Sequence, residues 1–455
     1  MTNIQVSNSN KSKAWALMVS PLIWFAFVLF GSFGAVGFLN GYPVIAWICG
    51  ILIHYYALKE SRTMIPVMVL LLFNSLFFVY ATPHVFWDID LIYMPISVSR
   101  PYITQTLWQI GLMVSVIMFC GKLLKHKTYP FISFADITSN MQKPRSAFCF
   151  YLIMTAICIA AIFFIKGENI LGKIDSYSLY VENLSGGSGL PEYLLIAFFW
   201  AALLINTKMQ KIVWYCVIML YVVLLLSFGL RVVALMGAIM TLWFSALRLS
   251  PRKTILVFVM GYFLFALFGL LKISTQSDYL LSSIFYETNE ENIVSHHGNV
   301  LWASSQMLSL IDQNIIDFKS RADFLTYLSM NSVIPSSIVQ KIQGGYLGSV
   351  LQQGGYTSGG GHAATYAFVA LSFPGIVLFG GIIGLGSIFA LSGRRGLFAD
   401  SVRCWFMFTL ITFPRWISYD LGNFFLRLPL YAAFGYAILI ILTRSQHTSK
   451  AESNA

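Results

Sequence analysis

Four arginines stand at the ends of long apolar runs: Arg100, Arg231, Arg415 and Arg427. A guanidinium offers a planar fork of N–H donors that matches phosphate oxygens, so arginines at a membrane mouth are suited to clamp a phosphate-bearing lipid headgroup. Such arginines can also serve only as anchors at the lipid surface. Anchoring explains Arg415 and Arg427 almost as well, whereas the turn Ser227-Phe-Gly-Leu-Arg231 is too short to carry its charge far from the lipid and favours binding.

Two further ionisable residues lie beside apolar runs. His362 ends a long hydrophilic segment immediately before such a run, where a neutral imidazole could take a proton from an attacking hydroxyl. An exposed loop histidine without a role would give the same pattern. Glu192 follows Pro191 and could be a base, or simply a charge partner for a helix N-terminus. We take Arg231 and His362 as catalytic candidates, and Glu192 with the other three arginines as substrate-binding candidates.

Composition indicates which elements must position these residues. Hydrophobic residues make up 57% of the 455 residues, charged residues make up 10%, and the mean hydropathy is +0.73. Continuous apolar runs of about 17 to 25 residues are typical of helices that cross a bilayer. The sequence therefore predicts an all-α, polytopic integral membrane protein. All six cysteines fall in or beside apolar runs, so we expect neither a disulfide framework nor a zinc site.

The chain divides into membrane helices on either side of one long segment. We expect membrane helices over residues 1–272, a large loop over 273–364, further membrane helices over 365–443 and a tail over 444–455. About twelve spans are predicted. They are Ala14–Phe33, Tyr42–Ala57, Met64–Ala81, Tyr102–Leu123, Ala147–Ile165, Tyr193–Ile205, Ile212–Leu226, Val232–Leu247, Thr254–Leu271, Thr365–Leu391, Val402–Phe413 and Leu428–Thr443.

Charge decides the orientation of these spans. With twelve spans, 19 Lys and Arg residues against 4 Asp and Glu residues lie on the side of the termini, and 10 against 14 lie on the opposite side. Membrane proteins keep the excess of Lys and Arg in the cytoplasm, which places both termini there and the long segment outside. The net charge of +11 thus reflects topology, and nucleic-acid binding does not follow from it.

The segment 273–364 is far longer than a connection needs, so we expect a working domain over the outer face. Its acidic and aromatic composition suits a sugar-binding surface, and equally a plain solvated loop. Within it, apolar residues at helical spacing predict an amphipathic helix lying flat on the outer leaflet. They are Leu301, Met307, Leu308, Ile311, Ile315 and Phe318.

Several of these features together resemble a known family. They are the outer arginine that opens a span in Ser227-Phe-Gly-Leu-Arg231, the large outside segment in the last third of the chain, and the stretch from His362 through Pro374-Gly375 into the next span. The arrangement resembles the O-antigen polymerase family, the Wzy class, and its relatives the O-antigen ligases. In the ligases a comparable histidine starts a segment that ends in a glycine, and His362 and Gly375 match that pattern.

The resemblance implies a membrane glycosyltransferase of GT-C-like architecture in the bacterial inner membrane, with cytoplasmic termini and a periplasmic loop. Such an enzyme transfers an oligosaccharide from undecaprenyl pyrophosphate to the nonreducing end of a lipid-linked repeat unit. Its partners would be that lipid-linked oligosaccharide, membrane lipid, a chain-length regulator and a flippase. The chemistry needs positive donors for the leaving diphosphate and a base for the acceptor hydroxyl, and requires no metal or other cofactor.

Two other functions compete with this one. An O-antigen ligase shares the donor but hands the chain to a lipid A core, and the sequence barely separates the two. A polysaccharide flippase or transporter also suits twelve helices. Transporters, however, tend to show paired halves, broken helices and ionisable residues near the midplane. Here the charges lie at helix ends and no repeat of two halves is seen, which favours the enzyme.

Overall fold

The structure, a computed structural model, describes residues 65–87, 96–123, 145–166, 190–227, 296–331 and 361–391, with scattered positions within 44–48, 234–260, 334–339 and 435–441. The described part is entirely α-helical, as the sequence predicts. Its helices are α3 (Ile65–Trp87), α4 (Ile96–Leu123), α6 (Arg145–Lys166), α8 (Leu190–Leu203), α9 (Lys208–Ser227), α13 (His296–Asp312), α14 (Phe318–Asn331) and α17 (Ala363–Leu391).

Two of the described helices contain stretches long and apolar enough to cross a membrane, Lys208–Leu226 in α9 and Ala363–Leu385 in α17. Both coincide with predicted spans, and helices α3, α4, α6 and α8 overlap four more. The predicted spans Met64–Ala81 and Tyr102–Leu123 leave residues 82–101 as the connection between them. The connection in the structure is shorter, because α3 continues to Trp87 and α4 begins at Ile96. The other predicted spans lie outside the described helices, so the count of twelve stays a prediction.

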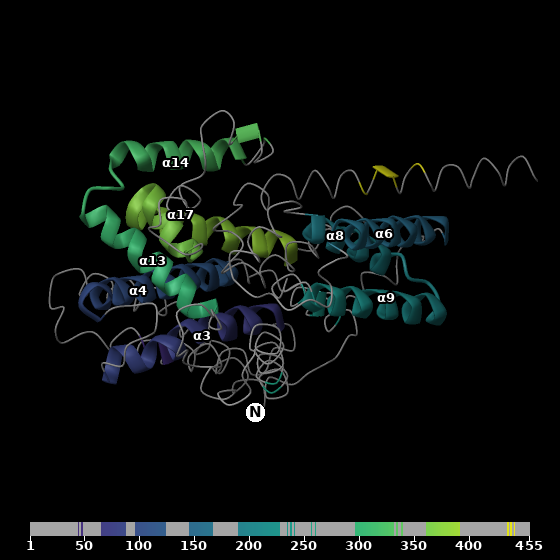
Figure 1. Cartoon of the computed structure of the whole chain (residues 1–455), viewed down its shortest axis with the longest axis horizontal. Coiled ribbons are helices and arrows are strands. Elements are labelled where there is room, and N and C mark those ends of the chain that lie inside the picture. The colour runs from purple at the N-terminus through teal and green to yellow at the C-terminus, as the bar shows by residue number, and fades with distance from the viewer. Residues whose placement is uncertain are drawn as a thin grey trace, which may run out of the picture.

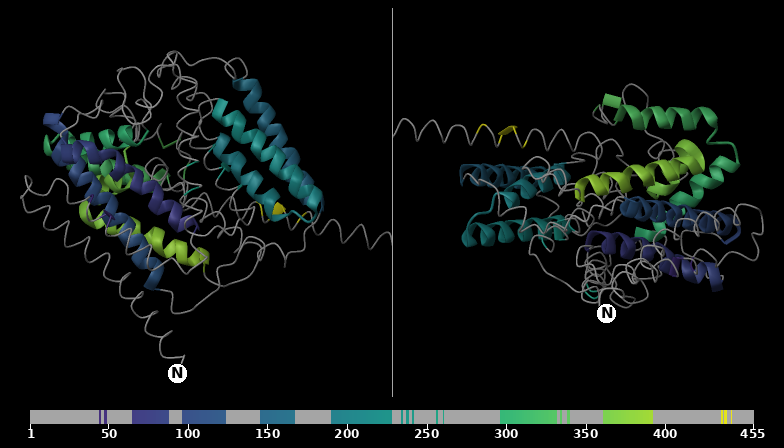
Figure 2. Two further views of the ribbon diagram at one scale, coloured as in Figure 1. Left: turned by 90° about the horizontal axis from the view of Figure 1, so that it is seen from below. Right: turned by 180° about the vertical axis from the view of Figure 1, so that it is seen from behind.

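The helices form two groups (Figure 1). One group contains α3, α4, α13, α14 and α17, and the other contains α6, α8 and α9 (Figure 2). In the first group α4 packs against α3, α13 and α17. Its middle is buried on every side, from Thr106 to Ile117, which is what an apolar helix enclosed by three neighbours requires. Helix α4 is therefore the centre of the first group.

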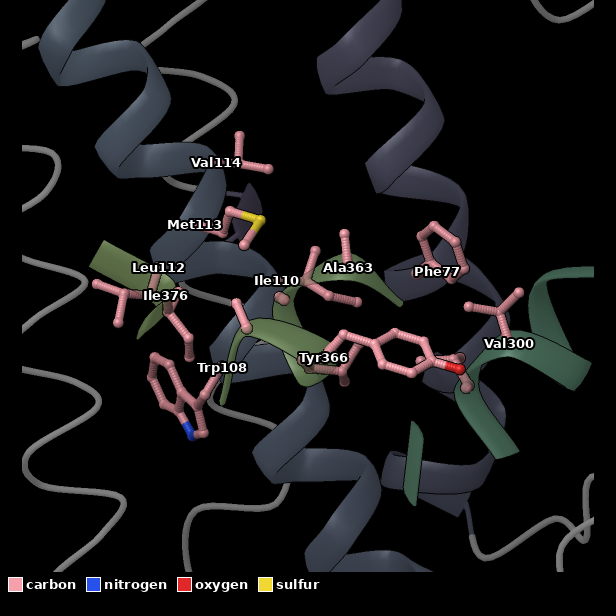
Figure 3. Close-up of a cluster of buried hydrophobic side chains, with 14 of the residues drawn as sticks. Phe77, Trp108, Ile110, Leu112, Met113, Val114, Val300, Ala363, Tyr366 and Ile376 are labelled. Atoms are coloured by element: carbon pink, nitrogen blue, oxygen red, sulfur yellow. The ribbon is translucent and has the colours of Figure 1, made fainter. Parts of the chain in front are cut away.

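Glycine allows a close approach between α4 and α17 at Gly380. A Cβ at Gly380 would lie 3.1 Å from the carbonyl oxygen of Met113 and 3.2 Å from the side chain of Val116. The two helices consequently meet with little side-chain volume between them. Figure 3 shows the apolar cluster around this contact, with Met113 on α4, Ile376 on α17 and Phe77 on α3.

Helices α8 and α9 form a tight hairpin. Thr207 begins α9 as its N-cap, and its hydroxyl accepts a hydrogen bond from the Gln210 backbone N–H at 3.2 Å. The Gln210 side chain returns to accept from the backbone N–H of Asn206 at 2.8 Å and of Thr207 at 3.1 Å. This reciprocal capping box satisfies N–H groups that a helix start leaves without partners.

A tight turn joins helices α13 and α14, inside the long segment. Asn314 has a φ of 60°, and the N–H of Ile315 donates to the Leu310 carbonyl at 2.9 Å, which ends α13 in a Schellman motif. Helix α14 then starts at the N-cap Asp317, whose Oδ1 accepts from the Ser320 hydroxyl and backbone N–H. These bonds from Ser320 lower the pKa of the exposed Asp317 carboxyl.

The amphipathic helix expected in the long segment is present as α13, but its surroundings differ from the expectation. Leu301, Met307 and Leu308 are buried, and α13 packs against α3, α4 and α17. Ile315 and Phe318 lie beyond its end and are exposed, because Asn314 turns the chain. The apolar face of α13 therefore covers protein, and the prediction that this face lies on a lipid leaflet is wrong.

Helix α17 is interrupted inside its apolar stretch. Leu371 (φ −138°, ψ 19°) and Ser372 (φ 57°, ψ −149°) have non-helical backbone angles, and Pro374 follows. We call residues 363–370 the first segment and 373–391 the second segment. Proline suits the first turn of a helix, where its missing N–H leaves no bond unmade. The second segment thus begins at a natural starting point, close against the first.

A glycine-to-alanine pair tests this close contact. A Cβ at Gly375 would collide with the backbone carbonyl of Ala367, whereas nothing lies within 4 Å of a Cβ at Gly381. Gly375→Ala should therefore destabilise the protein by about 1–3 kcal/mol, as overpacking does, and Gly381→Ala should leave stability almost unchanged. Thermal unfolding of the purified protein in detergent measures both. Equal midpoints for the two variants would contradict the interrupted geometry of α17.

Candidate functional site

His362 lies at the start of α17 with its ring enclosed by the first helix group. The residue is buried, and the ring meets that of Phe77 edge-on with centroids 5.2 Å apart. Its Nδ1 accepts a hydrogen bond from the backbone N–H of Ala364 at 3.0 Å, and its Nε2 lies 3.2 Å from Oδ1 of Asn74. Because a backbone N–H only donates, the Nδ1 lone pair is engaged and the proton is carried by Nε2.

This arrangement makes His362 the N-cap of α17. A side-chain acceptor at the N-cap satisfies one of the N–H groups that a helix start leaves free, here that of Ala364. Proton transfer from a substrate hydroxyl to Nδ1 would first require this bond to open, while Nε2 can only donate to Asn74 in the present tautomer. The role of His362 as a base stays a prediction. In this geometry, proton transfer to Nδ1 would also cost the free energy of breaking the hydrogen bond that caps α17.

Two more buried hydrogen bonds attach the start of α17 to its neighbours. The backbone N–H of His362 donates to the hydroxyl of Ser304 on α13 at 2.8 Å, and the hydroxyl of Thr365 donates to Oε1 of Gln109 on α4 at 3.0 Å. With Asn74 on α3, polar side chains from four helices meet here. We call these five residues the polar node. All five are at most 1% exposed.

The polar node retains unused donor capacity. Nε2 of Gln109 and the hydroxyl of the neighbouring Ser305 are buried without a hydrogen-bond partner in the described part of the chain. Buried polar groups normally find partners, from protein or from ordered water. The Gln109 amide nitrogen is therefore a buried donor that no described residue satisfies. Figure 3 shows the apolar wall beside the node, where Tyr366 reaches toward Val300.

A second polar contact lies at the other end of the first segment of α17. Nε of Arg321, on α14, donates to the Val369 carbonyl at 2.7 Å, and its Nη2 donates to the Phe368 carbonyl at 3.1 Å. The same Nη2 donates to the hydroxyl of Ser372 at 2.6 Å. The guanidinium thus donates to two of the last carbonyls of the first segment, at the end of a helix where such donors are favoured.

The other predicted site residues are not brought together in the described part of the chain. Arg231, Arg415 and Arg427 lie outside the described residues. Arg100 is in the second turn of α4, although its side chain is not described. Glu192 is likewise placed only by its backbone, at the start of α8 in the second helix group. Their substrate-binding roles stay predictions.

Sequence reasoning gave no role to Arg321 or to the buried amides. The Ser372-Phe-Pro374-Gly375 stretch carried a signal, since proline interrupts a helical pattern and glycine follows it. Among the described residues, no group of three His, Cys, Asp or Glu side chains could hold a metal ion.

Comparisons with known protein families, characterised proteins and solved structures gave no match to this chain.

A matched pair of threonine variants tests the polar node. Thr365→Val keeps the shape of the side chain but removes the donor to Gln109, leaving the amide oxygen buried and unpaired, and should cost about 1–3 kcal/mol of stability. Thr326→Val is the control, because the exposed Thr326 hydroxyl bonds only to the carbonyl of Ala322 in its own helix. Thermal unfolding in detergent should show a clearly lower midpoint for Thr365→Val alone, and equal loss in both variants would argue against a stabilising bond from Thr365 to Gln109.

Proposed function

We propose that the chain is a membrane glycosyltransferase that acts as an O-antigen polymerase in the bacterial inner membrane. The observation that carries the proposal is the attachment of α13 and α14 to the helix that follows them. Ser304 bonds to the start of α17, and Arg321 bonds to the interruption within it. A long segment that is folded and fastened to an apolar helix is suited to hold a substrate over the membrane surface.

The proposed reaction forms one glycosidic bond and breaks one bond to a diphosphate. An acceptor hydroxyl of a lipid-linked repeat unit attacks the anomeric carbon of the donor chain, and undecaprenyl pyrophosphate leaves with the bonding electron pair. The hydroxyl proton passes to a base, for which His362 is our candidate. Arg231 stabilises the charge on the leaving diphosphate, assisted by Arg415, Arg427 and Arg100.

The distribution of charge supports the orientation that this reaction needs. The excess of Lys and Arg on the side of the termini puts residues 273–364 in the periplasm, where lipid-linked repeat units are joined. Glu192 is then a candidate ligand for sugar hydroxyls at the same face. A chain-length regulator and a flippase are the proposed protein partners.

One observation favours transport as a second candidate. The interruption of α17 is the kind of broken helix that forms the binding sites of many transporters. In those sites the freed carbonyls face the transported ion or substrate. Here the Arg321 guanidinium donates to the carbonyls of Phe368 and Val369, which leaves transferase chemistry as our first choice.

Complementation of a strain that lacks the gene tests both candidates. Arg231→Ala should abolish polymerisation, because removal of one charge-stabilising donor lowers rates on the order of 10²- to 10³-fold. Arg231→Lys should restore only part of it, since the fork of donors is lost. Arg252→Ala, on the predicted cytoplasmic side, is the control. Surface polysaccharide is compared by gel, with protein levels matched by immunoblot.

The pattern on the gel separates the candidates. Loss of the ladder with a single repeat unit kept on the core supports a polymerase. Loss of every repeat from the core points to a ligase or a flippase. A wild-type ladder from Arg231→Ala at normal expression would remove the catalytic role of that arginine.

A further inference from the structure

We propose that the start of α17 is an acid-sensitive attachment point, which protonation of the His362 ring releases from its neighbours. The ring is buried within the first helix group, and its Nδ1 accepts a hydrogen bond from the backbone N–H of Ala364. Release of this kind does not depend on the proposed enzymatic activity.

Only the neutral ring can cap the helix. A neutral imidazole has one N–H and one lone pair, and here Nε2 lies 3.2 Å from Oδ1 of Asn74 while Nδ1 receives the Ala364 N–H at 3.0 Å. A proton added at Nδ1 would set two donors against each other across that 3.0 Å. Both ring nitrogens donate in the charged form, so the bond to Asn74 can survive protonation but the cap of α17 cannot.

Loss of the cap affects the hydrogen bonds around it. The carbonyl of His362 accepts from the backbone N–H groups of Thr365 and Tyr366 at 3.0 and 3.2 Å, and the His362 N–H donates to the Ser304 hydroxyl on α13 at 2.8 Å. Movement of the ring away from Ala364 therefore disturbs both the first turn of α17 and its bond to α13. Acid would in this way loosen the attachment of the long segment to the membrane helices.

The surroundings of the ring favour its neutral form. From α3 it is contacted by the uncharged side chains of Asn74 and Phe77. The carboxyl of α13, Asp312, is hydrogen-bonded to Tyr102 on α4. At 1.5 Å per residue, Asp312 lies about 12 Å further along α13 than Ser304. A carboxylate so far away compensates little for the lost hydration of a buried imidazolium. The other titratable or charged residues of the helices packed here are Tyr80 and His84 on α3, Arg100, Cys120 and Lys122 on α4, His296 and His297 on α13, Tyr366 on α17, and Lys319, Arg321, Asp323 and Tyr327 on α14.

The attachment should be stable at neutral pH and weaken in acid. When the start of α17 opens, the ring meets water and takes up a proton near the ordinary imidazole pKa of about 6.5. The open form gains this proton and the capped form does not, so the stability is fully present above that pH and is lost as the pH falls below it. Between about pH 7.5 and about 5.5 the opening equilibrium should shift about tenfold toward the open form.

Hydrogen–deuterium exchange of the full-length protein in lipid nanodiscs tests acid release. Protection factors, which are corrected for the intrinsic effect of pH on exchange, should fall about tenfold at the amides of Ala364 and Thr365 over this range. His362→Asn keeps a side-chain acceptor that is favoured at helix N-caps but cannot titrate, so its protection should not change with pH. Ser304→Ala is the matched control, because it loosens the same helix start and keeps the ring. Its protection should be lower throughout and show the wild-type fall.

An internal reference in the wild-type protein decides the matter if His362→Asn does not fold. The amide of Gln210 is held by the Thr207 hydroxyl at the start of α9, a cap that does not titrate in this range, so its protection should not vary with pH. Equal protection of Ala364 and Thr365 at both pH values, an equal fall at Gln210, or a tenfold fall that persists in His362→Asn overturns acid release.

Discussion

The structure depends on one constraint: polar groups enclosed by apolar helices need hydrogen-bond partners, because little water reaches them. The first segment of α17 meets this constraint at both of its ends. At its start His362 accepts from the backbone N–H of Ala364, and at its end Arg321 donates to the carbonyls of Phe368 and Val369. The cationic guanidinium also sits at the end of the segment that carries partial negative charge, which adds to the stabilisation. A buried piece of helix only two turns long is thereby fixed by side chains from other helices.

The same constraint explains why the long segment is part of the helix group. Ser304 on α13 and Arg321 on α14 each satisfy a group of α17, and α13 buries an apolar face against α3 and α4. The segment cannot leave without exposing apolar side chains and opening these bonds. This attachment underlies our proposal of a transferase in which the external segment and the membrane helices work as one unit.

The helices were largely predictable from the sequence, and their partners were not. The α8–α9 hairpin was predicted as two short apolar runs, and its turn carries a Thr-x-x-Gln capping signal at Thr207 and Gln210. Local periodicity also predicted α13. It could not show that the apolar face packs against protein, because a face covered by lipid and a face covered by other helices have the same apolar side-chain pattern. The end of α13 was missed because Asn314 adopts a backbone that glycine more often signals.

The candidate site was predictable only in part, for a related reason. His362 stood out by its place before an apolar run, but its partner Asn74 lies 288 positions away in the sequence. Nothing local indicates that the Nδ1 atom caps a helix. The interruption of α17 had a local signal in Pro374 and Gly375, while the arginine that completes it comes from a separate helix.

Arg321 has a consequence for how this protein can vary during evolution. Two of its three contacts are to main-chain oxygens, at Phe368 and Val369, and every amino acid supplies such an oxygen. The hydrogen bonds therefore set no requirement on the side chains at those two positions, which are restricted only by packing in the core. Covariation between Arg321 and its backbone acceptors should therefore be weak, and Ser372 is the position where correlated substitutions would reveal the contact.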